Sequence, residues 1–204
     1  MRQLKVIIMD KNKVYIFDDF LPSEVEDEIE DKIGLVSFRF GKNNYKGQIP
    51  KIKVKDSNLT NYNRSGLLQC WTFENNSWNV CDGVQWTEDI LKYLPFKYEL
   101  QRVKWNFNPK LSKSYKDKFM NPHCDINKGG WTAIYYVNNS DGDTIIFNEK
   151  PTDPFLNDEE LSIKKRIKNK KGRFVMFNQD YLHAGMPPIN SDYRVVINFN
   201  FKTI

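Results

Sequence analysis

The sequence predicts an α+β protein that is mainly β, with a double-stranded β-helix (jelly roll) supported by N-terminal helices. In the second half, short strand-like segments follow one another at close intervals, with clusters of turn-forming residues between them. In the first half, two segments carry start and stop signals typical of helices. At 204 residues the chain is long enough for one sizeable core. We therefore expect a single domain in which residues 1–97 support a jelly-roll core formed by residues 98–204.

The composition is that of an ordinary soluble protein, with 40% hydrophobic and 28% charged residues. The sequence has no run of eighteen apolar residues and begins without a long apolar segment, so a cytoplasmic protein with no membrane partner is expected. The three cysteines, Cys70, Cys81 and Cys124, are an odd number without paired metal-ligand spacing. They favour reduced thiols, with a Cys70–Cys81 bridge as the weaker alternative.

A strand over residues 14–17 is expected to precede the first helix. That helix should begin at Ser23, with Glu26 completing a capping box, and should stop at Gly34. Thr87 is expected to cap a second helix, which Pro95 ends.

The later strands are expected at residues 67–73, 98–107, 131–137, 144–147, 173–177 and 194–201. Two polar segments flank the strand 98–107. Residues 41–66 read as a long loop or a weak hairpin, and residues 108–122 read as a loop. Their length and polarity predict that both border the substrate entrance and are mobile without ligand.

Two histidines and one carboxylate predict a metal site. His123 and Asp125 are two residues apart, and on a strand such residues point to the same face. The only other histidine, His183, follows another predicted strand. Two histidines and one carboxylate with an open opposite side form the facial triad of non-haem Fe(II) oxygenases. Any one histidine by itself is more often a structural residue.

The last predicted strand places one arginine among neutral residues. Alternation separates two faces, one with Val195, Ile197, Phe199 and Phe201 and the other with Arg194, Val196, Asn198 and Asn200. The planar guanidinium of Arg194 suits a carboxylate ligand. The competing interpretation is an exposed arginine on an edge strand.

Taken together, His123-x-Asp125, His183 and Arg194 resemble the 2-oxoglutarate- and Fe(II)-dependent dioxygenases, and more closely their prolyl-4-hydroxylase-like branch. The segment 132–138, Thr-Ala-Ile-Tyr-Tyr-Val-Asn, resembles the family strand T-x-I-Y-Y-L-N. The segment 171–177, Lys-Gly-Arg-Phe-Val-Met-Phe, resembles the strand before the second histidine. The resemblance covers about residues 98–204, and its specificity comes from four elements in the right order.

The resemblance implies that Fe(II), 2-oxoglutarate and O2 are used, with ascorbate as a candidate reductant, and that 2-oxoglutarate is decarboxylated to succinate. It implies that His123, Asp125 and His183 hold the metal. It also implies that Arg194 and Tyr136 hold the distal carboxylate of 2-oxoglutarate. Further candidates for co-substrate contacts are Asn106 or Tyr115, and Asn198.

The substrate stays open at this point. The resemblance suggests a prolyl-type residue in a peptide or a free amino acid. The net charge of +5 and the basic run 164–171 leave a nucleic-acid-modifying oxygenase as an alternative. We favour solvated lysines on a strand edge for that run, by roughly four to one. A jelly-roll binding module that has lost activity is the remaining interpretation.

Overall fold

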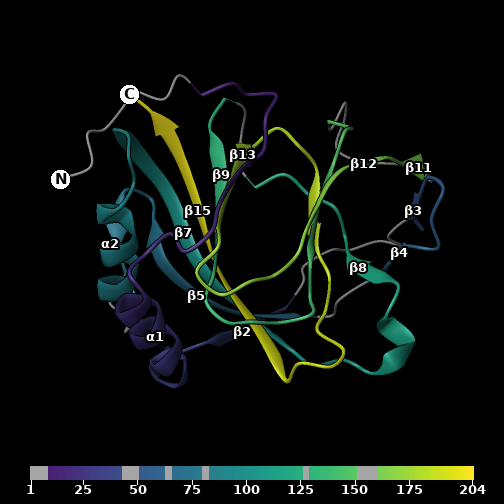
Figure 1. Cartoon of the computed structure of the whole chain (residues 1–204), viewed down its shortest axis with the longest axis horizontal. Coiled ribbons are helices and arrows are strands. Elements are labelled where there is room, and N and C mark those ends of the chain that lie inside the picture. Colours follow the sequence, from purple (N-terminus) through teal and green to yellow (C-terminus); the bar gives the residue numbers. More distant parts are fainter. Residues whose placement is uncertain (1–8, 43–50, 63–65, 80–82, 126–128, 151–159) are drawn as a thin grey trace.

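The computed structural model describes residues 9–42, 51–62, 66–79, 83–125, 129–150 and 160–204. The molecule is built in layers: two helices, a large sheet, a three-stranded sheet and a small outer sheet (Figure 1). Within the described residues, no helix is long and apolar enough to cross a membrane.

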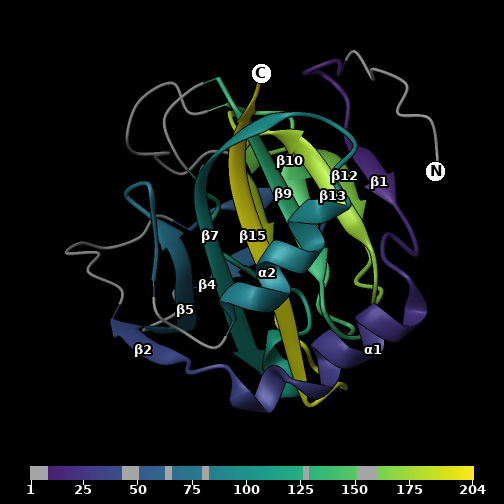
Figure 2. The same ribbon diagram turned by 90° about the vertical axis from the view of Figure 1, so that its left-hand side faces the viewer.

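The two α-helices lie in the first half of the chain. One short 3-10 turn follows the first helix, and a second lies in the other half of the chain. Figure 2 shows α1 and α2 in front of the large sheet, against its outer face. Their bounds are α1 Ser23–Asp31, 3-10 helix η1 Ile33–Leu35, α2 Val84–Lys92 and 3-10 helix η2 Lys113–Tyr115.

The large sheet, called the major sheet below, has the strand order β1-β13-β9-β15-β7-β5-β2, with β6 paired to β5. Its strands are β1 Tyr15–Phe17, β2 Arg39–Lys42, β5 Gly66–Glu74, β6 Ser77–Trp78, β7 Tyr98–Pro109, β9 Trp131–Tyr136, β13 Phe174–Asn178 and β15 Tyr193–Thr203. Of the expected strands, those at residues 14–17, 67–73, 98–107, 131–137, 173–177 and 194–201 are present in this sheet, within one or two residues at most ends.

The three-stranded sheet, called the minor sheet, has the order β12-β10-β14, and the small outer sheet has the order β11-β3-β4-β8. The minor sheet comprises β10 Thr144–Phe147, β12 Ile163–Ile167 and β14 His183–Gly185. The outer sheet comprises β3 Lys53–Val54, β4 Thr60–Tyr62, β8 Lys118–Met120 and β11 Glu160–Leu161.

The chain alternates between the two main sheets, which gives the expected jelly roll. It runs from β7 in the major sheet to His123, whose bridge to His183 extends the minor sheet. It then follows β9 (major), β10 and β12 (minor), β13 (major), β14 (minor) and β15 (major). Because β7, β15, β9 and β13 are neighbours, residues far apart in sequence share one sheet face.

Two faces of the major sheet have different roles. The outer face packs on the helices through Val195, Ile197, Phe199 and Phe201, the apolar set that the alternation of the last strand predicts. The opposite face turns toward the minor sheet, and we call it the inner face. Its apolar part contacts minor-sheet residues in a cluster made of Ile134, Tyr136, Ile146, Ile167, Val175, Phe177, Tyr181 and Val196. The polar members of the inner face build the site described below.

The helix caps differ from the expectation. Pro22 stands at the N-cap of α1, and the Ser23 side chain makes no capping bond. Glu26 instead accepts a hydrogen bond from the Leu21 backbone N–H at 3.3 Å. Thr87 lies inside α2, where its hydroxyl donates to the Gly83 carbonyl at 2.7 Å. Thr87 also accepts from the Trp105 indole, so tertiary contact decides its position.

The polar segment 41–66 contains a hairpin, the weaker of its two expected forms. Strands β3 and β4 pair antiparallel, and β4 continues the sheet onto β8, so this segment and the segment 108–122 lie side by side. Residues 43–50 and 63–65 of the first segment lie outside the described residues, as does Cys81. The mobility of both segments stays a prediction.

Three of the six basic residues in the run 164–171 form ion pairs. Lys170 contacts Asp19 at 2.9 Å, and Lys171 contacts both Asp27 and Glu30 of α1 at 2.5 Å. Arg166 contacts Asp143 at 2.7 Å. These pairs connect the strand edge and its turn to neighbouring segments, which favours the structural interpretation of the run.

Candidate active site

The backbones of the two histidines are directly hydrogen-bonded. His123 N–H donates to the His183 carbonyl at 3.1 Å, and His183 N–H donates to the His123 carbonyl at 3.0 Å. His183 opens β14, whereas His123 forms only this isolated bridge. The expected strand around His123 is therefore reduced to one extended bridge residue, and the bridge, not a regular strand, sets the spacing of the two rings.

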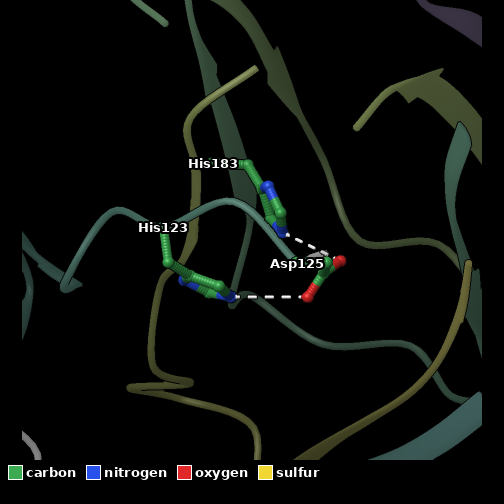
Figure 3. Close-up of side chains that lie close together, drawn as sticks. All are labelled: His123, Asp125 and His183. Carbon is green, nitrogen blue, oxygen red and sulfur yellow. Dashed lines mark ion pairs between the residues drawn. The ribbon is translucent and has the colours of Figure 1, made fainter. Parts of the chain in front are cut away.

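Figure 3 shows both imidazole rings turned toward the Asp125 carboxylate. The Nε2 atom of His123 lies 3.8 Å from Oδ1 of Asp125, and the Nε2 atom of His183 lies 3.5 Å from Oδ2. One ligand atom from each residue lies within 4.8 Å of the others. Three residues that the sequence separates by up to sixty positions thus converge on one point.

Hydrogen bonds orient both rings with Nε2 toward that point. The Nδ1 atom of His123 lies 3.1 Å from the Asn121 carbonyl, and Nδ1 of His183 lies 3.3 Å from the Tyr181 carbonyl. A carbonyl can only accept, so it favours the tautomer with the proton on Nδ1. The Nε2 lone pair is then free for a metal, as is usual for histidine ligands.

Three side chains from three strands hold the carboxylate of Asp125. Arg102 on β7 places Nη2 2.6 Å from Oδ1, as an ion pair without the alignment of a hydrogen bond. Thr132 on β9 and Asn200 on β15 donate to Oδ2 at 3.3 and 3.2 Å. Arg102 also donates to the Asn200 amide oxygen at 2.9 Å. This network fixes the carboxylate before any ligand binds.

The electrostatics favour an ionised Asp125 carboxylate and a neutral His123 imidazole. Burial by itself raises the pKa of Asp125, but His183, His123 and Lys104 outweigh it and hold the pKa well below its usual value. Desolvation, followed by the charge of His183, lowers the pKa of His123 to about 4, although 46% of its side chain is exposed. A metal cation needs both of these protonation states.

The donor set fits a divalent metal. Asp125 Oδ1 and His183 Nε2 are buried and have no hydrogen-bond partner within the described part of the chain. Unpartnered buried polar atoms are rare and need an explanation. Two imidazoles and one carboxylate with open positions suit Fe(II). These residues could therefore hold iron.

A second polar cluster lies where β15 meets the minor sheet. Arg194 is 2% exposed and donates from Nη2 to the Thr144 hydroxyl of β10 at 2.8 Å. Tyr136 on β9 donates to the same hydroxyl at 2.7 Å, and the Arg194 guanidinium lies over its ring. Arg194 Nε has no hydrogen-bond partner, and no carboxylate of the described residues forms an ion pair with this arginine.

Gly185 connects the two clusters. It follows His183 by two residues on β14, a separation of roughly 7 Å. A Cβ atom at Gly185 would lie 3.3 Å from Arg194 Nη1 and 2.6 Å from the terminal carbon of Met120. The absence of a side chain therefore lets the Met120 methyl group and the Arg194 guanidinium approach the backbone of β14.

The remaining co-substrate candidates are placed differently. Asn106 and Asn198 lie on the inner face, where Asn106 is paired with Val196 and accepts a hydrogen bond from Gln69. Asn198 is 7% exposed. Tyr115 lies on η2 with 36% of its surface exposed, and its ring packs edge-on against Tyr62. The geometry thus leaves the two asparagines as better candidates than Tyr115.

Several residues that support the site were not predicted from the sequence: Arg102, Lys104, Thr132, Thr144, Gly185 and Asn200. A usable signal was present in β7 and β15, where polar residues alternate with large apolar ones. A polar residue on the buried inner face of a strand needs a partner, and that requirement points to a site.

Comparison with protein families gives one match, to the 2OG-Fe(II) oxygenase superfamily over residues 111–202. This range contains the metal cluster and Arg194. Comparison with curated protein sequences gave no match.

Solved structures share the fold at low sequence identity. A viral collagen prolyl hydroxylase from Paramecium Bursaria Chlorella virus-1, in complex with 2-oxoglutarate, has 16% identity and a TM-score of 0.50, over 97% of this chain and 99% of that one. A Trichoplax adhaerens prolyl hydroxylase bound to a hypoxia inducible factor peptide has 13% identity and a TM-score of 0.55, over 94% and 84%.

A Pseudomonas putida prolyl-4-hydroxylase has 13% identity and a TM-score of 0.51, over 93% of this chain and 92% of that one. The epimerase SnoN from nogalamycin biosynthesis has 11% identity and a TM-score of 0.55, over 94% and 79%. The fold is thus shared by enzymes with different reaction outcomes. The family match over residues 111–202, the shared fold and the sequence motifs together make this chain similar to the 2OG-Fe(II) oxygenase superfamily.

Proposed function

We propose that His123, Asp125 and His183 hold Fe(II), that Arg194 holds 2-oxoglutarate, and that the enzyme hydroxylates a prolyl-type residue in a peptide or a free amino acid. One observation carries the co-substrate assignment. Arg194 is a buried cation without a carboxylate partner in the described chain, on the same inner face as the metal cluster. A buried charge of this kind is costly unless a ligand neutralises it.

The residues around the two clusters have different roles. Arg102, Thr132 and Asn200 keep the Asp125 carboxylate ionised and oriented. Thr144 and Tyr136 fix the direction of the Arg194 guanidinium. Bound Fe(II) would supply the oxidative chemistry with O2 and 2-oxoglutarate. The protein would bind, orient and shield the reactants.

The substrate class rests on analogy. Three of the structural neighbours are prolyl hydroxylases, and one of them binds a peptide. A nucleic-acid substrate has less support, because Arg166, Lys170 and Lys171 are engaged in ion pairs. An epimerase among the neighbours makes product analysis necessary.

The first experiment measures succinate formed from 2-oxoglutarate by the purified protein with Fe(II), ascorbate and air. Succinate is expected even without a primary substrate, at a low rate. Addition of proline-containing peptides and free amino acids, with mass spectrometry of the product, tests for the gain of one oxygen atom. A protein that binds Fe(II) but forms no succinate would contradict the proposal.

The second experiment replaces Arg194 with methionine. A hydrogen bond to a charged group contributes roughly 1.5–3 kcal/mol, so the affinity for 2-oxoglutarate should fall by about ten- to a hundredfold. Mn(II) affinity should hardly change. Arg194→Lys should restore part of the loss, because it keeps the charge but not the planar fork. Arg166→Met is the matched control, since Arg166 is 46% exposed and pairs with Asp143. An unchanged affinity in Arg194→Met would make the site a metal site for another ligand.

A further inference from the structure

Lys104 is a buried cation that the functions assigned above do not use. It lies in the middle of β7 on the inner face, 9% exposed, in register with Asn198 of β15 and Trp71 of β5. Its Nζ atom lies 5.4 Å from the centre of the Trp71 ring. Lysine is almost never this buried unless it is paired.

Lys104 has no hydrogen bond and no ion pair with any residue that the structure describes. Burial lowers its pKa, and Asp125 is the one group whose charge acts against that effect. Asp125 forms no ion pair with Lys104; its two carboxylate oxygens contact Arg102 on one side, and Thr132 and Asn200 on the other.

A charge count gives the same result. Among the described residues, three largely buried cations lie on the inner face, Arg102, Lys104 and Arg194, and Asp125 is the carboxylate paired with the first. Fe(II) and the 2-oxoglutarate dianion carry equal and opposite charges. An excess of positive charge therefore remains after both have bound. Of the two cations without an ion pair, Lys104 is the one that lies two residues from Arg102, the partner of Asp125.

The position of Lys104 limits what the missing anion can be. Lys104 follows Arg102 by two residues on the same face, and its charge acts on both Asp125 and His123. An anion at Lys104 would therefore hold the rest of a small molecule close to the metal. The Trp71 ring borders this position, with both Lys104 and Arg102 over it. A residue inside a peptide has no carboxylate on its backbone.

We propose that Lys104, beside Trp71, binds a carboxylate of the primary substrate, so that the enzyme acts on a small free acid such as an amino acid. This inference rests on the proposed dioxygenase function and narrows it. It separates the free amino acid from the internal peptide residue, which the sequence leaves as equal possibilities.

The experiment measures binding of matched acids and amides to the protein loaded with Mn(II) and 2-oxoglutarate, which does not turn over. L-proline and L-prolinamide are the first pair, followed by the other common amino acids and their amides. Calorimetry and thermal unfolding give the affinities. At least one acid should bind about tenfold or more tightly than its amide, the smaller effect of a bond to a charged group.

Variants then assign the effect to Lys104. Lys104→Met should weaken binding of that acid by about ten- to a hundredfold and leave the amide unchanged. Lys104→Arg should keep part of the preference for the acid over its amide. Lys104→Gln is a second neutral variant if the methionine variant does not fold. Lys110→Met is the matched control, because Lys110 lies just beyond the end of the same strand with 47% of its side chain exposed.

Three outcomes would overturn the inference. No acid of the panel binds, the amides bind as tightly as the acids, or Lys104→Met weakens the binding of 2-oxoglutarate and not that of the acid. The last outcome would assign Lys104 to the co-substrate. These three outcomes can be distinguished from failure of the proposed dioxygenase function. If the dioxygenase function is wrong, the wild-type protein will form no succinate with Fe(II), whatever the binding panel shows.

Discussion

The metal cluster (His123, Asp125 and His183) and the cluster around Arg194 are both charged and buried, yet their charges are balanced differently. Asp125 has Arg102 as a counter-ion and two hydrogen-bond donors on its other oxygen. Arg194 has hydroxyl and aromatic neighbours but no carboxylate partner in the described residues. Among the described residues, the first cluster therefore contains its own counter-ion and the second does not. In the proposed function, Fe(II) would complete the first cluster and 2-oxoglutarate would supply the counter-charge of the second.

Arg102→Met should have the largest effect, a decrease in the free energy of unfolding caused by the loss of the ion pair with Asp125. Removal of one partner of a buried ion pair leaves an uncompensated charge and typically costs about 3–5 kcal/mol. Asp125 is 1% exposed at its side chain, so this cost applies to it. Urea unfolding of the metal-free variant measures the loss. A change below about 1 kcal/mol would mean that Arg102 is not the partner that holds Asp125.

Asp125→Asn should remove most metal binding. Changes in outer partners of a ligand already cost about ten- to a hundredfold in metal affinity, so loss of a ligand should exceed roughly a hundredfold. His183→Ala should act similarly. Calorimetry with Mn(II) is the measurement, and Asp192→Asn is the matched control, because Asp192 is 88% exposed. Unchanged affinity in either ligand variant would reject the triad.

Arg194→Met should change stability in the opposite direction from Arg102→Met. It removes a buried cation that has no counter-ion, so the ligand-free protein should become more stable by about 1 kcal/mol despite the lost bond to Thr144. Thermal unfolding without 2-oxoglutarate checks the sign. If Arg194→Met destabilises as much as Arg102→Met, the two clusters do not differ as described.

Tyr136→Phe should give the smallest effect. The hydroxyl bonds to Thr144, which in turn accepts from Arg194, so its loss loosens the guanidinium without removing any charge. One neutral hydrogen bond contributes about 0.5–1.5 kcal/mol, and the affinity for 2-oxoglutarate should fall by about two- to tenfold. Titration of 2-oxoglutarate at saturating Mn(II) measures it. A loss as large as that of Arg194→Met would make Tyr136 a direct ligand.

The parts of the fold that the sequence predicts well are those in which periodicity alone decides burial. The two faces of β15 follow directly from alternation, because one face meets the helices and the other meets the minor sheet. The caps of α1 and α2 were wrong, because local capping competes with tertiary contacts. Thr87 contacts Trp105, which is eighteen residues away and cannot be seen in a local pattern.

The identities of the metal cluster and of Arg194 come from the sequence, because the chain has only two histidines and one arginine in its last strand. Only the tertiary structure decides which charged side chains contact each other. The pairing of β7 with β15, and of β15 with β9, brings Arg102, Thr132 and Asn200 to Asp125 and leaves Lys104 and Arg194 without carboxylates among the described residues. Strand register is a long-range property, and it determines which buried charges are neutralised by the protein and which require a ligand.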